Sequence, residues 1–581
     1  MTATAMRSQC CGEIGIADVG SKVQLCGWVA HRRDHGEHLA FVDLRDHTGI
    51  IQCVLDGSVE VRSEWVVRIE GTVRRRPEGT DNPDLATGQV EVSQCEVEVL
   101  AEAEAPPFPV DDRVSADEML RLRHRYVDLR RPRMQANIRL RARVMGALRD
   151  SMASQGFCEV ETPLLWTPTP EGAREFTVPS RLHKGEFYVL PQSPQLAKQL
   201  LMVGGVDRYF QLARCLRDED LRADRQFEFT QLDLEASFVD QADIQRAVTE
   251  AVLAATRAAL GDDIDVPGVE TFTWREAMER FGTDKPDTRF GIELVDLTAV
   301  FESTEVKAFS APCVKAIVVP GGAVMGRSKL DALVQQAKSL GAKGLAWFKV
   351  ISVAPLVVES PLDKFISITE RESLVDVSQA SPGDLIAVVA SDWRTACSVL
   401  GQLRLATGRP GIHEGGLRYC WVTEFPMFDG LDEQGRPQAA HHPFTMPHPD
   451  DVHLMASDPL SVRSQAYDLV LNGWELGSGS IRVHREDIQR QIFDALGIGF
   501  AEAEERFGFL LGAFRYGAPP HGGFAVGVDR LVALLAGEEN IREVIAFPKT
   551  QSGTDPMTNA PRELAPGVLR DLGLQVIPRN S

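Results

Sequence analysis

The first hundred residues alternate between apolar and polar positions with a period of two. Val23, Leu25 and Val29 fall on one face of such a pattern, and apolar runs at residues 39–44 and 50–55 flank a short glycine-containing turn. Alternation of this kind is typical of strands that bury one face. The pattern therefore predicts a β domain at the start of the chain.

Two further runs, residues 65–69 and 89–100, bring the number of short strands to five. The last run changes phase between Val92 and Cys95, which predicts a β-bulge. Five short strands with glycine-containing turns match a five-stranded oligonucleotide-binding (OB-fold) barrel over residues 1–105. A folded β domain without a nucleic-acid function is the alternative.

The predicted barrel carries residues suited to nucleic acid. Phe41 is suited to stack on a base and the Gln52 amide to hydrogen-bond a base edge. Arg32 and Arg33 are suited to contact phosphate. A proline-rich linker, residues 105–109, ends the domain.

An amphipathic stripe predicts a helix from Gln135 to Gln155, with Gly156 as its stop. A strand then runs into Pro163. Helix, strand and proline together are compatible with a dimer interface, and equally with an ordinary core helix and edge strand.

Period two returns on both sides of a charged loop, residues 217–225. This predicts two antiparallel strands, with Gln231, Asp233 and Glu235 on one face of the second. Burying carboxylates without partners is costly, so this face is predicted to line a polar cavity. Gln195 and Lys198 are three residues apart on a predicted helix and so share a face, where the lysine either meets an anion or lies in solvent.

Between residues 286 and 412 the sequence predicts strands alternating with helices and contains no polar site residues of the kind described above. Apolar runs at residues 315–320, 344–353 and 383–390 predict strands, and residues 328–340 and 395–406 predict helices. The segment is therefore predicted to be an α+β insertion, and it has no cluster of catalytic type.

Polar site residues resume after the insertion. Asp468 and Glu475 stand beside apolar strand residues, a costly arrangement that Mg²⁺ bound to phosphate would relieve. Arg530 follows a glycine-rich turn and begins an apolar helix, where backbone donors also favour an anion. No Gly-x-x-x-x-Gly-Lys-Ser/Thr loop is present, so phosphate recognition would rest on arginine and metal.

Composition narrows the class of protein. A net charge of −21 argues against a protein that coats nucleic acid non-specifically, although nine arginines and one aspartate, Asp128, fall between Arg121 and Arg143. Solvated helix positions and structural arginine pairs are the simple interpretation of that segment.

No apolar run is long enough to span a bilayer, so a cytoplasmic protein without membrane contact is expected. Ten scattered cysteines without a Cys-x-x-Cys pair indicate reduced thiols and no zinc site.

Three stretches together resemble the bacterial-type aspartyl-tRNA synthetases, a class II aminoacyl-tRNA synthetase family. The class II motifs resemble, in order, the segment ending in Glu161-Thr-Pro163, the segment from Arg214 to Glu235, and the segment from Gly523 to Leu531. Gln-Ser-Pro-Gln-Leu-x-Lys from residue 192 and His-His-Pro-Phe-Thr from residue 441 add specificity. The closest rivals, the class II enzymes for asparagine and lysine, share the barrel and the motifs.

The resemblance implies a multidomain α+β protein that forms a homodimer. Its expected parts are an OB-fold anticodon-binding barrel (1–105), a linker (106–134), a class II catalytic domain with a mixed, mainly antiparallel sheet in two segments (135–285 and 413–555), the insertion (286–412) and a C-terminal extension (556–581).

The family also implies roles for matching positions. Arg217 and Arg530 are the expected catalytic residues. The expected aspartate-binding residues are Glu171, Gln195, Lys198, Arg217, Asp233, His441 and Arg482. The expected ATP-binding residues are Arg217, Asp218, Glu219, Gln226, Glu475, Gly527, Val528, Asp529 and Arg530, with Asp468 and Glu475 as Mg²⁺ ligands. The expected anticodon residues are Arg32, His35, Phe41, Gln52 and Gly79.

The implied reaction attaches L-aspartate to tRNA(Asp) with ATP, through an aspartyl-adenylate. Family members that also charge tRNA(Asn) have His in an Arg-Arg-Asp-His-Gly turn and Gly in Arg-Pro-Glu-Gly, as at His35 and Gly79 here. The matches imply a non-discriminating enzyme with a tRNA-dependent amidotransferase downstream. A strictly discriminating ligase and a non-catalytic RNA-binding paralogue are the alternatives.

Overall fold

The N-terminal strands close into a barrel, as the alternation predicts. The computed structural model describes residues 4–168 and 173–577. Neighbouring barrel strands follow the order β1-β2-β3-β5-β4, and β1 closes the ring by pairing with β4. The strands are β1 (Lys22–Asp34), β2 (Leu39–Arg45), β3 (Ile50–Asp56), β4 (Val66–Arg75) and β5 (Val90–Ala101).

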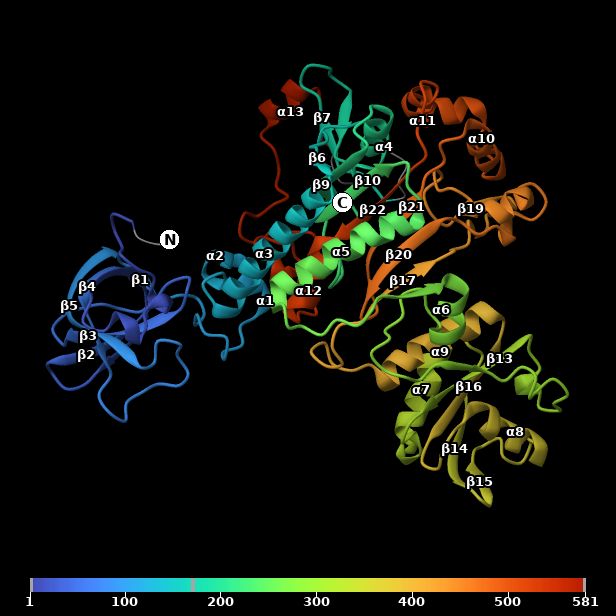
Figure 1. Ribbon diagram of the computed structural model, residues 1–581, viewed down its shortest axis with the longest axis horizontal. Coiled ribbons are helices and arrows are strands. Elements are labelled where there is room, and N and C mark those ends of the chain that lie inside the picture. The colour runs from blue at the N-terminus through green and yellow to red at the C-terminus, as the bar shows by residue number, and fades with distance from the viewer. Residues whose placement is uncertain (1–3, 169–172, 578–581) are drawn as a thin grey trace. The chain divides into compact units, whose positions relative to one another are not determined.

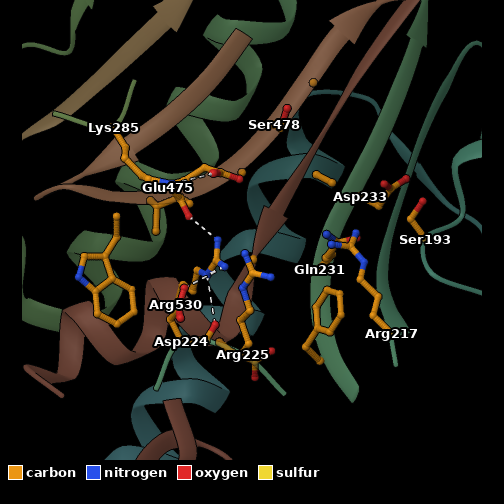
Figure 2. A pocket seen from close by; sticks show the side chains of 18 of the residues that line it. Ser193, Arg217, Asp224, Arg225, Gln231, Asp233, Lys285, Glu475, Ser478 and Arg530 are labelled. Atoms are coloured by element: carbon orange, nitrogen blue, oxygen red, sulfur yellow. Dashed lines mark hydrogen bonds and ion pairs between the residues drawn. The ribbon is translucent and has the colours of Figure 1, made fainter. Parts of the chain in front are cut away.

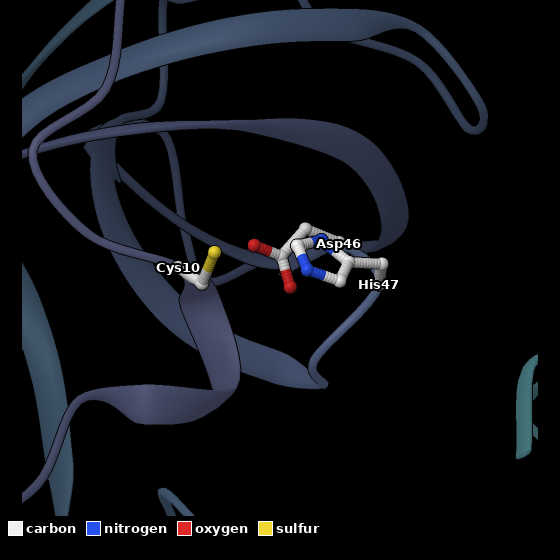
Figure 3. A group of neighbouring side chains, drawn as sticks. All are labelled: Cys10, Asp46 and His47. Atoms are coloured by element: carbon white, nitrogen blue, oxygen red, sulfur yellow. The ribbon is translucent and has the colours of Figure 1, made fainter. Parts of the chain in front are cut away.

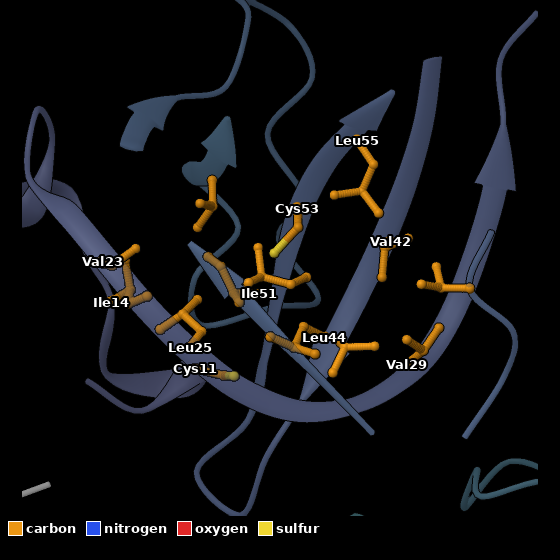
Figure 4. Close-up of a cluster of buried hydrophobic side chains, with 14 of the residues drawn as sticks. Cys11, Ile14, Val23, Leu25, Val29, Val42, Leu44, Ile51, Cys53 and Leu55 are labelled. Atoms are coloured by element: carbon orange, nitrogen blue, oxygen red, sulfur yellow. The ribbon is translucent and has the colours of Figure 1, made fainter. Parts of the chain in front are cut away.

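Alternate side chains of these strands fill the barrel (Figure 4). Leu25, Val42 and Ile51 are fully buried, because every second residue of a strand points to the same side. The predicted bulge is confirmed: Gln94 has φ of 54°, and the register with β4 shifts between Glu70 and Thr72. The extra residue keeps apolar side chains inside on both sides of the phase change.

The arginine-rich segment forms structural ion pairs. It contains α1 (Glu118–Arg123) and α2 (Arg125–Asp128). Asp128, fully buried, accepts hydrogen bonds from Arg121 and Arg125, and Arg121 also binds Glu543 with an N–O distance of 2.7 Å. These three contacts support the simple interpretation for Arg121 and Arg125, because a buried carboxylate requires cationic partners.

The described chain forms two compact units. One comprises Met1–Arg141 with Arg542–Leu564, and the other comprises Ala142–Ile541 with Ala565–Ser581. α3 (Pro132–Ser154) contributes to both. It begins three residues before the predicted start, because Pro132 in a first helical turn forfeits no intrahelical hydrogen bond.

The second unit is built on an eight-stranded sheet in the order β11-β17-β20-β21-β22-β10-β9-β6 (Figure 1). β11 pairs with β17 and β6 with β9 in parallel, and the other pairs are antiparallel, which confirms the predicted mixed sheet. The strands are β6 (Cys158–Glu159), β9 (Arg208–Leu216), β10 (Glu228–Ser237), β11 (Glu270–Thr273), β17 (Tyr419–Thr423), β20 (Ala466–Leu471), β21 (Trp474–Ile481) and β22 (His521–Gly527).

Helices and two small hairpins surround this sheet. The hairpins are β7 (Thr177–Pro179) with β8 (Phe187–Val189), and β18 (Phe428–Leu431) with β19 (Pro437–Ala439). The helices are α4 (Gln195–Val203), α5 (Gln241–Leu260), α6 (Trp274–Phe281), α10 (Glu486–Ala495), α11 (Phe500–Phe514), α12 (Val528–Ala536) and α13 (Pro566–Leu572). Pro194 directly precedes α4, so the helix start that positions Gln195 lies where the sequence predicts it.

The insertion has its own sheet, in the order β12-β13-β16-β14-β15. Its elements are β12 (Leu294–Asp296), β13 (Cys313–Val319), α7 (Arg327–Ser339), β14 (Ala346–Val353), β15 (Leu356–Glu359), α8 (Ile368–Ser378), β16 (Leu385–Ser391) and α9 (Trp393–Gly408). On β16, Leu385 and Ala387 pack in the core that includes α7 and α9, whereas Ile386 and Val388 pack in the core that includes α8. The sheet therefore has helices on both faces.

The two chain segments that join the insertion to the large sheet are tied together. Asp287, fully buried, forms ion pairs with Arg289 (2.6 Å) and with Arg409 (3.3 Å). Arg404, also fully buried, donates to the carbonyl groups of Asp287 and Ile292 at 2.9 and 2.8 Å. These contacts hold the outgoing and returning segments side by side.

Among the residues described, no helix has both the length and the apolar character needed to cross a bilayer. The cytoplasmic location expected from the sequence stays a prediction.

Candidate active site

A cavity of about 760 Å³ opens in the second unit between β10, β21, β22 and the start of α12. Of the residues predicted to share one face of β10, Gln231 and Asp233 line the cavity, together with Phe229, whereas Glu235 is fully buried and is not part of the lining. β9 and β10 pair in antiparallel register, with Asp233 opposite Gln211. The predicted hairpin thus forms one wall of a polar cavity.

Three residues of the cavity lining, Lys198, Asp233 and Arg482, form a buried charge network with Glu235. Lys198 Nζ lies 2.9 Å from Asp233 Oδ2 and 3.3 Å from Glu235 Oε2. Arg482 donates from Nε to Glu235 Oε1 at 3.0 Å and from Nη1 to Ser480 Oγ at 2.8 Å. Glu235 is thus held by both cations, a role that its strand position alone did not reveal.

Burial and charge oppose each other in this network. Burial raises the pKa of Asp233 to about 6, even though the Lys198 charge works to lower it. Burial also works to raise the pKa of Glu235, but the charges of Arg482 and Lys198 outweigh it and hold that pKa below its ordinary value. Glu235 is therefore the permanent counter-ion, whereas Asp233 changes charge near neutral pH.

Three buried polar atoms of the cavity lining have no hydrogen-bond partner within the described chain: the donors Gln195 Nε2 and His442 Nε2 and the acceptor Asp233 Oδ1. A fourth such atom, Asp468 Oδ1, belongs to β20, the strand that pairs with β21 of the cavity wall. Buried polar atoms are rarely left unpaired, since each costs about 1–3 kcal/mol. The atoms therefore mark where a ligand has complementary groups.

The two adjacent histidines of His-His-Pro-Phe-Thr face different neighbours. His441 packs edge-on against the Phe425 ring, and its pKa is lowered by burial and pulled upward by Glu475. His442 lies beside Arg482 and Lys198, whose charges add to burial in lowering its pKa to about 3. His442 was not predicted, because adjacent histidines cannot be told apart from the sequence.

Three arginines labelled in Figure 2 also line the cavity: Arg217 on the side of Ser193 and Asp233, and Arg225 and Arg530 nearer Glu475 and Asp224. The Arg217 guanidinium lies over the Phe229 ring, with 5.0 Å from Cζ to the ring centroid. Arg530 donates from Nη1 to the Glu475 carbonyl at 2.9 Å and pairs through Nη2 with Asp224 at 3.1 Å. Both guanidinium groups line the cavity, where they can meet an anion such as a polyphosphate.

The expected nucleotide residues divide into two groups. Those that line the cavity are Arg217, Glu219, Gln226, Glu475, Gly527, Asp529 and Arg530. Asp218 and Val528 are not among the lining residues, and Asp529 Oδ2 accepts a hydrogen bond from the Thr230 backbone N–H at 2.8 Å. Asp529 thus ties α12 to β10.

The acidic pair Asp468 and Glu475 fits a divalent cation. The two residues come from adjacent strands, β20 and β21, and burial followed by the Glu475 charge raises the pKa of Asp468 well above its ordinary range. Asp468 Oδ1 is one of the buried acceptors without a partner. Hard carboxylate oxygens are the ligands that Mg²⁺ prefers, so the donor set suits this ion.

The ends of the insertion contribute two cations to the cavity wall. Lys285, just before the insertion, places Nζ 3.9 Å from Glu475 Oε2, and Arg409 lies where the chain returns. Neither was predicted, since nothing in the local sequence shows that the two ends of a long insertion reach one cavity.

The expected anticodon residues all lie in the barrel unit. Phe41 contacts His35 edge-on, with ring centroids 6.4 Å apart. Gln52 accepts from Arg33 at 3.2 Å and donates to Glu91 at 2.7 Å. Arg32 pairs with Asp34 at 2.9 Å, and Gly79 is exposed with φ of 80°. Glu91, a buried carboxylate beside Gln52, was not predicted.

One cluster of metal-ligating type occurs elsewhere in the described chain, Cys10 with Asp46 and His47 (Figure 3). Asp46 already accepts from the Cys11 N–H at 2.9 Å and from the Thr48 N–H and hydroxyl at 2.8 and 2.6 Å. These bonds explain the carboxylate as the cap of a turn. The expectation of no zinc site stays a prediction. Glu171, one of the expected aspartate-binding residues, lies outside the residues that the structure describes.

Two family models match the chain. One, described as class II tRNA synthetases (D, K and N), matches residues 117–551, and the other, an OB-fold nucleic acid binding domain, matches residues 23–103. The chain belongs to the class II tRNA synthetases. These matches confirm the predicted barrel and the family of the catalytic domain.

Known relatives of this synthetase are similar over almost their whole length. The Aspartate--tRNA(Asp/Asn) ligase of Moorella thermoacetica is 51% identical, with 99% of this chain and 98% of that protein covered. The protein of the same name from Halothermothrix orenii is 47% identical, with 98% of both covered. The Aspartate--tRNA ligase of Geobacillus kaustophilus is 48% identical, with 99% of this chain and 100% of that protein covered. The aspartyl-tRNA synthetase family implied by the motifs is thereby confirmed.

Solved structures support the fold of this synthetase. The asparaginyl-tRNA synthetase from Pyrococcus horikoshii, complexed with asparaginyl-adenylate, gives a TM-score of 0.58 at 20% identity and covers 93% of this chain and 97% of that chain. The asparaginyl-tRNA synthetase from Entamoeba histolytica gives a TM-score of 0.58 at 17% identity, covering 91% and 95%.

Proposed function

We propose that this protein attaches L-aspartate to tRNA(Asp) and tRNA(Asn), using ATP and passing through an aspartyl-adenylate. The observation that carries the proposal is the set of unpaired buried atoms in one cavity. Next to Lys198 and Arg482, the donors Gln195 Nε2 and His442 Nε2 suit a carboxylate, and the acceptor Asp233 Oδ1 suits an ammonium group. An amino acid with an anionic side chain satisfies both kinds of atom.

The first step needs positioning more than acid–base chemistry. An oxygen of the aspartate α-carboxylate attacks the α-phosphorus of ATP, the bond from that phosphorus to the bridging oxygen breaks, and pyrophosphate leaves with the electron pair. Because the nucleophile is already an anion, no general base is required. Arg217 would hold the reacting carboxylate and α-phosphate together, and Arg530 would bind the departing phosphates.

Magnesium would assist at the same end of the cavity. Asp468 and Glu475 would hold the ion, which supplies positive charge to the phosphates when bound. Arg530, fixed by the Glu475 carbonyl and by Asp224, would orient the phosphates independently.

In the second step a terminal ribose hydroxyl of tRNA attacks the carbonyl carbon of the mixed anhydride, the bond from that carbon to the phosphate oxygen breaks, AMP leaves with the electron pair, and the hydroxyl proton is released. The barrel would read the anticodon, with Phe41 stacking a base and the Gln52 amide, held by Arg33 and Glu91, meeting a base edge. His35 and Gly79 support acceptance of both tRNAs, as do the names of the relatives from Moorella and Halothermothrix. An amidotransferase would then convert Asp-tRNA(Asn).

A homodimer is part of the proposal. β6, only two residues long, is the free edge of the large sheet, and the segment after it exposes Leu164 and Leu165 with about half of each side chain in contact with solvent. A free strand edge followed by exposed leucines suits pairing with a second copy.

The deciding experiment has two parts. Aspartate-dependent ATP–pyrophosphate exchange without tRNA separates the enzyme from a non-catalytic RNA-binding paralogue, which would show no exchange. Charging of purified tRNA(Asp) and tRNA(Asn) under identical conditions then tests the tRNA range. Charging of tRNA(Asp) alone would make the protein a discriminating ligase.

A further inference from the structure

His442 lines the cavity, and two contacts with Phe444 orient its ring. Its ring lies against Phe444, with centroids 5.1 Å apart and planes tilted by 31°. Arg482, Lys198 and Glu235 are the charged groups that surround it. The ring therefore faces the same space as the two buried cations.

The protonation state of His442 follows from its contacts. The Phe444 backbone N–H donates to His442 Nδ1 at 3.3 Å, so Nδ1 must be the unprotonated nitrogen. The proton is then on Nε2, which is buried and has no partner in the described chain. Burial and the neighbouring cations keep the pKa of His442 near 3, so the imidazole is neutral at physiological pH.

We propose that His442 determines side-chain specificity: its Nε2–H donates to the side-chain carboxylate of aspartate, as a third donor beside Lys198 and Arg482. The inference rests on the proposed function and extends it, because the expected aspartate-binding residues include His441 of the histidine pair but not His442. Three donors that converge on one carboxylate match its four lone-pair positions better than two.

The same arrangement rejects an amide. An asparagine side chain would bring an NH₂ group to a wall where His442 Nδ1 is engaged by the Phe444 N–H and Glu235 by Arg482 and Lys198, while the acceptor Asp233 Oδ1 is taken by the substrate ammonium. Its hydrogens would meet donors, and a site built for one hydrogen-bond pattern rejects the other strongly. His442 is thus the third residue, after Lys198 and Arg482, that presents only a hydrogen-bond donor to the substrate side chain.

Two substitutions in the full-length protein test this role by different routes. His442→Phe keeps a flat ring against Phe444 but removes the donor. It should raise the KM for aspartate in pyrophosphate exchange by about tenfold, while the KM for ATP stays within twofold of wild type. His442→Gln keeps a donor and adds a carbonyl acceptor. This variant should have a KM for aspartate close to that of wild type, but its kcat/KM for asparagine should be about tenfold higher than that of wild type. His453→Phe, at an exposed histidine, should match wild type in every measurement.

The unchanged KM for ATP also shows that each variant cavity is folded, and if the Phe variant does not fold, the Gln variant carries the test. The proposal is overturned if His442→Phe leaves the aspartate KM within twofold of wild type. It is also overturned if either variant raises the KM for ATP as much as that for aspartate, or if His442→Gln leaves discrimination unchanged. Absence of aspartate-dependent exchange in the wild-type protein would instead refute the proposed function.

Discussion

Lys198 and Asp233 form a buried ion pair, with 2.9 Å between Nζ and Oδ2 and about 1% of each side chain exposed. Removing one member of a buried pair leaves an uncompensated charge, at a cost of about 3–5 kcal/mol. Lys198→Met should therefore lower the free energy of unfolding by about 3 kcal/mol in urea titrations. Lys198→Met combined with Asp233→Asn should recover part of this loss, and purely additive losses would contradict the pairing.

The raised pKa of Asp233 predicts a pH dependence of aspartate binding. Lys198, Glu235 and Arg482 are the charged groups that face it, and its pKa of about 6 means that the carboxylate is charged above pH 6 and protonated below. The acceptor for the substrate ammonium is lost as the pH falls, so the KM for aspartate should rise below pH 6 and be flat from pH 7 to 8. Asp233→Asn should have a high KM without that inflection.

Arg217 should be essential for adenylate formation. Arg217→Ala should reduce pyrophosphate exchange at least about a hundredfold, the scale for loss of one preorganised charge contact. The matched control is Arg214→Ala, three residues earlier on β9, whose side chain is 46% exposed and pairs with Glu228 outside the cavity. Near-normal exchange by the Arg217 variant would disprove its catalytic role.

Lys285 should contribute to phosphate binding from the insertion side of the cavity. A charge-assisted contact contributes about 1.5–3 kcal/mol, so Lys285→Met should raise the KM for ATP and for pyrophosphate by about tenfold or more. The KM for aspartate should not change. Lys307→Met, at an exposed lysine of the insertion, should behave as wild type, and equal effects of the two variants would refute the contact.

Phe41 should act on tRNA alone. Loss of base stacking costs about 1–3 kcal/mol, so Phe41→Ala should raise the KM for both tRNAs by about tenfold. Exchange measured without tRNA should be unaffected, because Phe41 and the cavity belong to different units. A matching fall in exchange would show that the substitution damages the whole protein.

Patterns carried by local sequence were predictable, including the barrel strands, the bulge near Gln94 and the hairpin that presents Asp233. These depend on period and turn chemistry, which neighbouring residues determine. Contacts between distant residues were not predictable. Glu235 and Arg482 are separated by 247 positions, and the His442 tautomer depends on one backbone N–H. That hydrogen bond depends on how the loop from His442 to Phe444 folds, which the residue types alone do not determine.

The tie between Asp287 and Arg409 also bears on how such a chain can be assembled in evolution. A domain whose two ends are joined by an ion pair, with 3.3 Å between Arg409 Nε and Asp287 Oδ2, can replace a single loop of the domain that carries it. Its acquisition or loss would leave strand pairing in the host sheet intact, because β11 and β17 pair with each other directly on either side of the interruption. The whole insertion between β11 and β17 could therefore be gained or lost as a single unit.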